Sequence, residues 1–233
     1  MGGWLASAEA CLPKGAAVGV DPRTVTIAAA KRMHSALSRS GLRLTAADNN
    51  PVDEAWASER PGVPSDPLRV HPDELAGESV TSKLNRLRES MRLHNASVLV
   101  VSALDEVAWL LNLRGSDVDC NPVFFGFVLV TAASHDSSSK GAAAVGVGAS
   151  ESSSASDSVD PSVDGVHLFL PAGKLELPPK DGMPPSVTAP AKHLADCGVT
   201  VHEYEAAYGA VEATAAWCEA QAAGELADGA SAP

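Results

Sequence analysis

The sequence predicts an α/β fold with mixed β-sheet flanked by helices, and three segments carry this prediction. Residues 16–44 read in the order strand, helix, strand, which is typical of a parallel β-unit with a connecting helix. Residues 79–101 combine a helix that has one apolar stripe with an apolar strand after it. Residues 123–130 are almost entirely hydrophobic and rich in Val and Phe, as expected of a strand buried on both faces.

The first segment divides into short elements. An apolar strand is expected over residues 16–20, a helix over residues 24–38, and a second strand over residues 42–44 that pairs parallel with the first.

A short helix and a linker are expected next. Residues 51–56 should form a helix that packs Val52 and Trp56. Four prolines then make residues 59–78 an extended linker between domains.

The helix of residues 79–94 is the clearest in the sequence. Its apolar residues share one stripe: Val80, Leu84, Leu87 and Met91. Its basic residues lie off that stripe and are expected to be solvated: Lys83, Arg86, Arg88 and Arg92. Residues 97–101 should form a buried strand of the parallel type, and Ser102 should cap the following helix.

The second half of the chain should continue the same pattern. Residues 123–130 and 166–170 are expected to pair as antiparallel strands. A Pro-rich loop (171–190), a short strand (199–202) and a helix (208–222) with Val211 and Trp217 facing inward complete the predicted elements.

The polar loop ahead of residues 123–130 is the most informative part of the chain, because loops held between core elements often carry function. Arg114 offers a planar fork of donors suited to a carboxylate, and Trp109 offers a flat apolar wall. Asn112 lies between them in the sequence.

A structural interpretation of the same loop stays open. Arg114 could pair with a neighbouring carboxylate, and Trp109 could belong to the core. Gly115 is expected where the backbone needs a positive φ. The carboxylates within reach of Arg114 are Asp105, Asp117 and Asp119.

The composition is that of a soluble globular protein. Of 233 residues, 45% are hydrophobic but only 4% aromatic, so a core that is light in places is expected. The formal net charge of −12 argues against nucleic acid and anionic membrane surfaces as partners. The four scattered cysteines, the missing signal peptide and the lack of a membrane-spanning run predict a cytoplasmic protein with reduced thiols.

No catalytic pattern is present in the sequence. His202-Glu203 lacks the second His of an H-E-x-x-H helix, and the G-x-S-x-G, Walker and Rossmann patterns are absent. The seven histidines have no metal-ligand spacing. We therefore expect no catalytic residue, no metal ligand and no cofactor in this chain.

Several segments closely resemble the N-terminal region of cytosolic Xaa-Pro aminopeptidases (aminopeptidase P) that have three domains. The long motif runs from Leu104 to Asp117, LDEVAWLLNLRGSD, and continues as Asn121-Pro122-Val123-Phe124-Phe125. Shorter matching pieces fall in the same order: residues 18–22, 50–56 and 83–88.

The resemblance implies creatinase-like N-terminal domains, the first of them incomplete. The expected organisation is a partial first domain (1–58), the linker (59–78), a second domain (79–223) with a disordered Ser/Ala/Gly insertion (132–161), and a disordered tail (224–233). The exposed strand edges of a partial domain favour low solubility or association.

The resemblance also implies a function. In this family a catalytic pita-bread domain holds two divalent metals, usually manganese, and removes an N-terminal residue that precedes proline. That domain is not visible among these residues, so the chain alone is expected not to hydrolyse peptides.

The implied partners are the catalytic domain, peptides with proline at the second position, and a second copy in a homodimer. The candidate substrate-pocket residues are Trp109, Asn112 and Arg114, and the expected structural residues of the loop are Gly115, Asp117, Asn121 and Pro122.

Two other interpretations remain. The chain could be a free-standing protein-interaction module on a creatinase-like scaffold, or a truncated gene model of an active enzyme.

Overall fold

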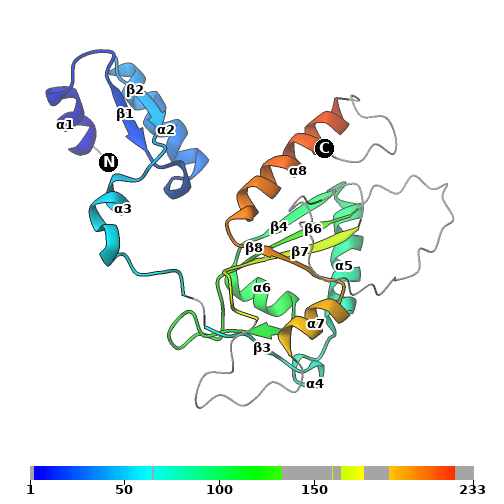
Figure 1. Ribbon diagram of the computed structural model, residues 1–233. Coiled ribbons are helices and arrows are strands. Elements are labelled where there is room, and N and C mark those ends of the chain that lie inside the picture. The colour runs from blue at the N-terminus through cyan, green and yellow to red at the C-terminus, as the bar shows by residue number, and fades with distance from the viewer. Residues whose placement is uncertain (1–2, 65, 133–158, 160–163, 176–188, 224–233) are drawn as a thin grey trace, which may run out of the picture. The chain divides into compact units, whose positions relative to one another are not determined.

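The computed structural model describes residues 3–64, 66–132, 159, 164–175 and 189–223 (Figure 1). The chain divides into two compact units, Met1–Gly62 and Val63–Pro233, and each is described by itself. The predicted tail and the predicted insertion lie outside the described residues, except for Ala132 and Val159 of the insertion. No helix in the described part of the chain is long and apolar enough to cross a membrane.

The first unit contains a parallel strand pair, as predicted. Strand β1 (Ala17–Val20) pairs with β2 (Arg43–Ala46), and helix α2 (Ile27–Arg39) connects them. Helix α1 (Gly3–Cys11) precedes β1. The other elements of the unit are short: η1 (Pro22–Thr24), α3 (Pro51–Trp56) and η2 (Ala57–Glu59).

Helix α3 does not pack the side chains expected of it. Val52 and Trp56 are both exposed, and the helix has no buried residue. Six residues make less than two turns, so the helix has little surface to bury. A polar cap holds its start instead, because the Asn50 side chain accepts a hydrogen bond from the backbone N–H of Val52.

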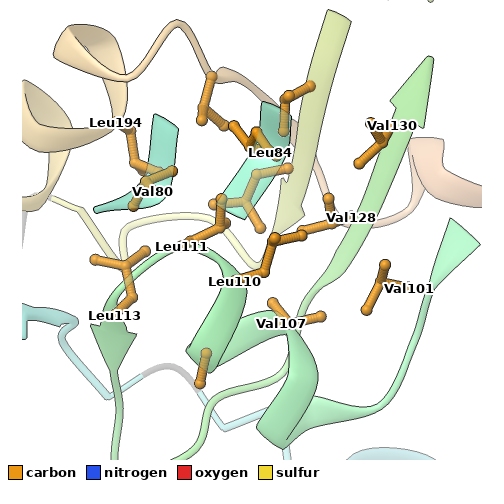
Figure 2. Close-up of a cluster of buried hydrophobic side chains, with 14 of the residues drawn as sticks. Val80, Leu84, Val101, Val107, Leu110, Leu111, Leu113, Val128, Val130 and Leu194 are labelled. Carbon is orange, nitrogen blue, oxygen red and sulfur yellow. The ribbon is translucent and has the colours of Figure 1, made fainter. Parts of the chain in front are cut away.

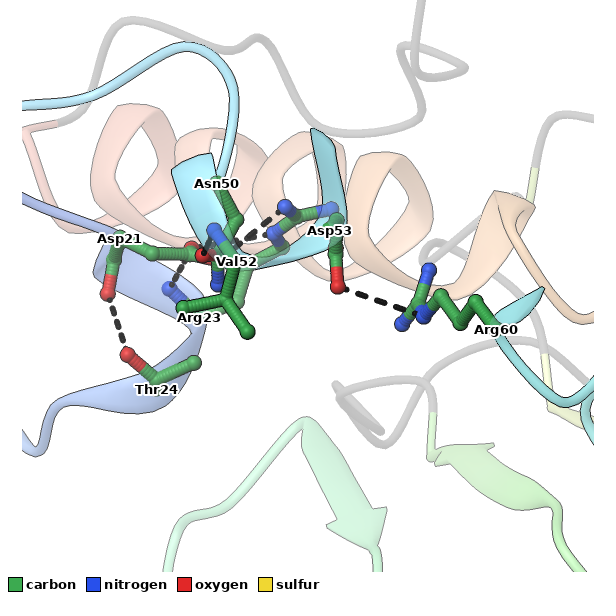
Figure 3. A network of polar contacts seen from close by, with 7 residues as sticks. All are labelled: Asp21, Arg23, Thr24, Asn50, Val52, Asp53 and Arg60. Carbon is green, nitrogen blue, oxygen red and sulfur yellow. Dashed lines mark hydrogen bonds and ion pairs between the residues drawn. The ribbon is translucent and has the colours of Figure 1, made fainter. Parts of the chain in front are cut away.

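Asp21 joins the end of β1 to the start of α3, as Figure 3 shows. One carboxylate oxygen accepts from Arg23 Nε at 3.1 Å, and the other accepts from Arg23 Nη2 at 3.1 Å and from Asn50 Nδ2 at 3.0 Å. These hydrogen bonds, those from Arg23 above all, lower the pKa of Asp21 to about 2. Two segments 29 positions apart are thereby held together by a carboxylate that stays ionised.

The second unit is built on a four-stranded mixed sheet in the order β4-β6-β7-β8. Its strands are β4 (Val98–Val101), β6 (Phe127–Thr131), β7 (Gly165–Leu170) and β8 (Thr200–Glu203). Strands β6 and β7 pair antiparallel, as predicted, whereas β8 runs parallel to β7 after helix α7 (Pro190–Asp196).

Helices cover both faces of this sheet. Alternate residues of β6 lie in two separate apolar clusters, with Val128 and Val130 in one and Leu129 in the other. The first cluster also contains residues of α5 (Val80–Leu93), α6 (Leu104–Leu110) and α7, and part of it is drawn in Figure 2. The second cluster contains Ala207 and Ala210 of α8 (Ala206–Ala222). The expectation of a strand buried on both faces is confirmed for β6.

The second half of the predicted linker belongs to the second unit. Leu68 is buried in its main apolar cluster, β3 (Arg69–Val70) pairs antiparallel with β5 (Leu113–Arg114), and α4 (Asp73–Ala76) follows. The sequence did not predict these elements among the prolines, because a strand of two residues and a helix of four are too short to show an apolar pattern.

Three further details differ from the sequence expectations. Strand β4 pairs antiparallel with β6 at an edge of the sheet, instead of lying in a parallel interior position. Helix α6 begins after Ala103 and has no side-chain cap, so Ser102 does not play that role. In α8, Trp217 is buried as expected, but Val211 is exposed.

Two histidines lie side by side on the neighbouring strands β7 and β8. His167 Nδ1 is 3.0 Å from His202 Nε2, and the ring centroids are 5.2 Å apart. Burial and the nearby His202 lower the pKa of His167 to about 4. One nitrogen of this pair donates its N–H and the other accepts it, so a proton added to the accepting nitrogen would remove the hydrogen bond.

This pair predicts acid sensitivity. The unfolded His167 has a pKa of about 6.5, so between about pH 6.5 and pH 4 the unfolded chain binds a proton that the folded chain does not. The free energy of unfolding should therefore fall as the pH falls through this window. In urea titrations above about pH 5, where few carboxylates titrate, the free energy of unfolding of the His167→Asn variant should depend less on pH than that of the wild type. The exposed His94→Asn is the control, and an unchanged slope in His167→Asn would contradict the assignment.

Candidate functional site

The candidate loop begins with a left-handed turn at Asn112. Helix α6 ends at Leu110 with Leu111 as its C-cap, Asn112 has φ of +49°, and the chain enters β5 at Leu113. Asn tolerates this backbone region better than other residues with a Cβ. The positive φ expected at Gly115 is therefore found three residues earlier.

A buried lysine fixes this turn. Lys83, expected on the solvated face of its helix, is only 2% exposed. Its ammonium donates to Trp109 O at 2.7 Å and to Asn112 Oδ1 at 2.6 Å. Burial lowers the pKa of Lys83, and Glu78 is the main neighbour that opposes this shift.

The side-chain amide of Asn112 is fully used within the protein. Its Nδ2 donates to Asp73 Oδ1 at 2.8 Å and to Glu78 O at 2.9 Å, and its own backbone carbonyl accepts from His71 N at 2.7 Å. Asn112 is buried, so it positions the loop and offers no atom to a ligand.

Trp109 is not a core residue. It is 47% exposed, and the Lys83 ammonium lies 4.4 Å from its ring centroid, within the range of a cation–π contact. The ring lines a groove with Leu87 of α5 and Glu106 of α6. The indole is therefore held in place and still offers surface to another molecule.

Arg114 makes no ion pair with a carboxylate of the described residues. Its Nη1 donates to Leu113 O at 2.8 Å and to Ala108 O at 3.3 Å. It faces Arg69 directly across the β3–β5 pair, and Arg69 Nε is buried without a hydrogen-bond partner in the described part of the chain. Burial and these two guanidiniums also lower the pKa of His71. Like charges at opposed strand positions are unfavourable unless an anion joins them, so this corner is suited to a carboxylate.

Gly115 is required by close packing. A Cβ at this position would lie 2.5 Å from Phe124 Cβ and 2.9 Å from Val123 O. The Gly115 N–H donates to Pro122 O at 3.3 Å, and Asn121 N donates to Val118 O at 3.1 Å. The hydrophobic run begins as irregular backbone with a bend at Phe125, and strand β6 starts only at Phe127.

Asp117 closes the base of the loop through a fully buried ion pair. Its Oδ1 lies 2.6 Å from Lys174 Nζ, and both side chains are 0% exposed. The carboxylate also accepts from the backbone N–H groups of Asp66 and Phe125, and Lys174 donates to Asp66 O. Three segments that are distant in the sequence meet at this pair.

The sequence interpretation missed three residues of this site: Arg69, Lys83 and Lys174. Lys83 was the only one with a usable signal, because it lies next to Leu84 of the apolar stripe. Nothing in the local sequence marks Lys174 as buried.

The described residues do not provide a metal centre. No three His, Cys, Asp or Glu side chains among them lie close enough together to hold a metal ion. The loop offers an aromatic face and guanidinium groups, which suit the binding of a ligand.

Replacing Lys83 by Met should destabilise the second unit. The substitution keeps the buried hydrocarbon but leaves Asn112 Oδ1 and Trp109 O without their donor, a loss of about 1–3 kcal/mol. The exposed Arg86→Met on the same helix should change the free energy of unfolding by less than about 1 kcal/mol. Equal effects of the two variants in chemical denaturation would contradict this role.

The Asp117–Lys174 pair should show strong energetic coupling. Lys174→Met leaves a buried carboxylate unpaired and should cost about 3–5 kcal/mol. The double variant with Asp117→Leu should be less destabilised than the sum of the two single variants. The exposed Lys192–Asp196 pair, also 2.6 Å long, is the matched control, and Lys192→Met should cost at most about 1 kcal/mol. Additive effects at Asp117 and Lys174 would rule out the coupling.

Comparison with known proteins identifies the domain that carries this loop. Residues 59–138 match the family model described as Creatinase/Prolidase N-terminal domain. A probable Xaa-Pro aminopeptidase P of Fusarium vanettenii is 48% identical over 115 residues, which are 49% of this chain and 19% of the relative. The corresponding protein of Aspergillus niger is 44% identical over 117 residues, which are 50% of this chain and 19% of the relative. The chain thus spans about a fifth of the length of the curated relatives it matches.

A solved structure supports the fold. The X-prolyl aminopeptidase of Caenorhabditis elegans, described as a cytosolic enzyme with a di-nuclear active site, matches with a TM-score of 0.64 and 23% identity over 95% of this chain and 28% of that one. The resemblance read from the sequence motifs is confirmed: residues 59–138 match the creatinase/prolidase N-terminal domain, and the curated relatives that match about half of this chain are probable Xaa-Pro aminopeptidases.

Proposed function

We propose that this chain is the non-catalytic N-terminal part of an Xaa-Pro aminopeptidase, and that its loop from Trp109 to Pro122 shapes the substrate pocket. The observation that carries the proposal is a contrast within the loop. Asn112 and Asp117 are buried and fully bonded, whereas the Trp109 ring is open to a ligand and Arg114 has no described carboxylate partner.

The buried residues give the loop the rigidity that a pocket wall needs. Lys83 and Lys174 hold it from two sides through short hydrogen bonds to Asn112 and Asp117. A side chain that is already ordered loses less entropy when a ligand binds. In this proposal Asn112, Gly115, Asn121 and Pro122 act by holding the loop in shape.

In this proposal Arg69 and Arg114 supply the specificity for a peptide that has a free C-terminal carboxylate. Two guanidiniums at opposed strand positions suit the C-terminal carboxylate of a short peptide. Trp109 would bound the pocket with its apolar face and so limit the size of the bound peptide.

The chemistry itself would come from the catalytic pita-bread domain. Two divalent metals, manganese in this proposal, would be held there, since the described residues of this chain offer no group of ligands. Peptides with proline at the second position would be the substrates, and the cytoplasm the location. Contacts with the catalytic domain and with a second subunit complete the proposed role.

The test is Arg114→Ala in a full-length Xaa-Pro aminopeptidase that carries this region. Losing a charged hydrogen bond to the substrate should lower kcat/KM by about 10- to 100-fold for an Xaa-Pro tripeptide with a free carboxylate. The C-terminally amidated tripeptide is the matched control substrate and should lose much less. Arg92→Ala, at an exposed arginine near the end of α5, is the control variant.

Two results would contradict the proposal. Unchanged kinetics together with a lower free energy of unfolding in Arg114→Ala would leave only a structural role for that residue. Hydrolysis of Xaa-Pro peptides by the 233-residue chain supplied with manganese would show that the chain is itself catalytic.

A further inference from the structure

Three polar side chains share the outer face of the strand pair β3–β5. Val70 and Leu113 are opposed in its register, Leu113 is fully buried, and Val70 packs against the same apolar cluster. Side chains alternate between the two faces of a strand, so the residues that flank this pair point away from the core. Three of these flanking residues are Arg69, His71 and Arg114.

His71 continues the strand pair by one position. Its backbone N–H donates to Asn112 O at 2.7 Å, so the pairing of the two segments extends to this residue. The His71 side chain is half-buried, and its ring makes no hydrogen bond within the described part of the chain. Both ring nitrogens are therefore available to a ligand that reaches this face.

The groups that act on the imidazole are cationic. Burial lowers the pKa of His71 most, and the guanidiniums of Arg114 and Arg69 and the ammonium of Lys83 lower it further. The ring is therefore neutral near pH 7 as long as no anion lies between the guanidiniums.

The titratable groups of the helices next to β3 lie elsewhere. Asp73 and Glu74 of α4 and His193 of α7 line a cleft together with Val70, the residue that points to the opposite face. The remaining charged residues of α7 pair with each other: Lys192 and Asp196. A carboxylate for the outer face of β3–β5 would therefore come from a ligand.

We propose that His71 is a third donor to the C-terminal carboxylate of the substrate and takes up a proton as that carboxylate binds. This role rests on the proposed function, in which Arg69 and Arg114 receive the same carboxylate. The two oxygens of a carboxylate have lone pairs enough for two guanidiniums and one imidazolium. The proton comes from solvent when the peptide binds and returns to solvent when the product leaves.

Affinity for a free carboxylate then rises as the pH falls. A bound negative charge favours the imidazolium, so the pKa of His71 is higher in the complex than in the free protein. Between these two pKa values the complex holds a proton that the separate partners do not, and acid therefore favours binding. Each unit of difference between them corresponds to about a tenfold gain in affinity at acidic pH.

The test is the pH dependence of substrate selectivity in a full-length Xaa-Pro aminopeptidase that carries this region. The measured quantity is kcat/KM for an Xaa-Pro tripeptide divided by kcat/KM for its C-terminal amide. Titration of the catalytic groups cancels in this ratio, and the peptide carboxylate, with a pKa of about 3.5, stays ionised. The wild-type ratio should rise about 10-fold between about pH 8 and about pH 5.5.

Two variants complete the kinetic test. In His71→Asn the ratio should be independent of pH and close to the wild-type value at about pH 8, because the amide donates a hydrogen bond but takes up no proton. His94→Asn is the matched control, since His94 is exposed at the C-cap of α5, and it should retain the wild-type profile.

The outcomes separate the role of His71 from the pocket itself. If Arg114→Ala does not lower the ratio at about pH 8, the carboxylate does not bind at this corner, and the proposed pocket fails together with the role of His71. If Arg114→Ala lowers the ratio but the wild-type ratio is constant with pH, or rises equally in His71→Asn, only the role of His71 is overturned.

Calorimetry detects the proton without any variant. The product of the reaction, a dipeptide that begins with proline, and its C-terminal amide are titrated into the same enzyme at about pH 6.5 in two buffers that differ in heat of ionisation. The dipeptide with a free carboxylate should take up about half a proton more than the amide. Equal proton uptake by the two dipeptides would overturn the role of His71.

Discussion

The burial of β6 and β7 on both faces is the constraint on which the second unit depends. Their alternate residues lie in two different apolar clusters, so helices must cover each side of the sheet. Helices α5, α6 and α7 cover one side, and α8 covers the other. The segment that precedes β6 is packed in the same way, because Phe124 is fully buried against Gly115. The candidate loop is therefore held by the core on one side and by buried ionic groups on the other.

The sequence predicted those parts of the fold that depend on long apolar patterns. The helix of residues 79–94, the parallel pair β1–β2 and the antiparallel pair β6–β7 all follow from periodicity and order along the chain. The direction of β4 could not be predicted in this way. An apolar strand after a helix has the same pattern in parallel and antiparallel sheets, and only its pairing with β6 decides between them. The run from Val123 to Val130 likewise begins with irregular backbone that bends at Phe125, which the apolar pattern did not reveal because buried residues outside strands can be as apolar as strand residues.

The sequence predicted where the candidate site lies, but not which buried residues hold its loop in place. The motif around Trp109 and Arg114 pointed to the correct loop, because polar residues between two apolar runs are visible in any sequence. Lys83 was misplaced because a lysine on an amphipathic helix is normally solvated. Its burial depends on Asn112, 29 positions away, which a one-dimensional pattern does not reveal. Lys174 meets Asp117 across 57 positions, and only the folded chain brings them together.

Asn112 has a consequence for how this loop can change during evolution. Its position demands a left-handed backbone and also an amide that accepts from Lys83 and donates to Asp73. Glycine would satisfy the backbone but leave the buried ammonium without this acceptor. Aspartate would satisfy the ammonium but set a second carboxylate against Asp73. Neither substitution is therefore neutral by itself, and a lineage that replaces Asn112 must also replace Lys83.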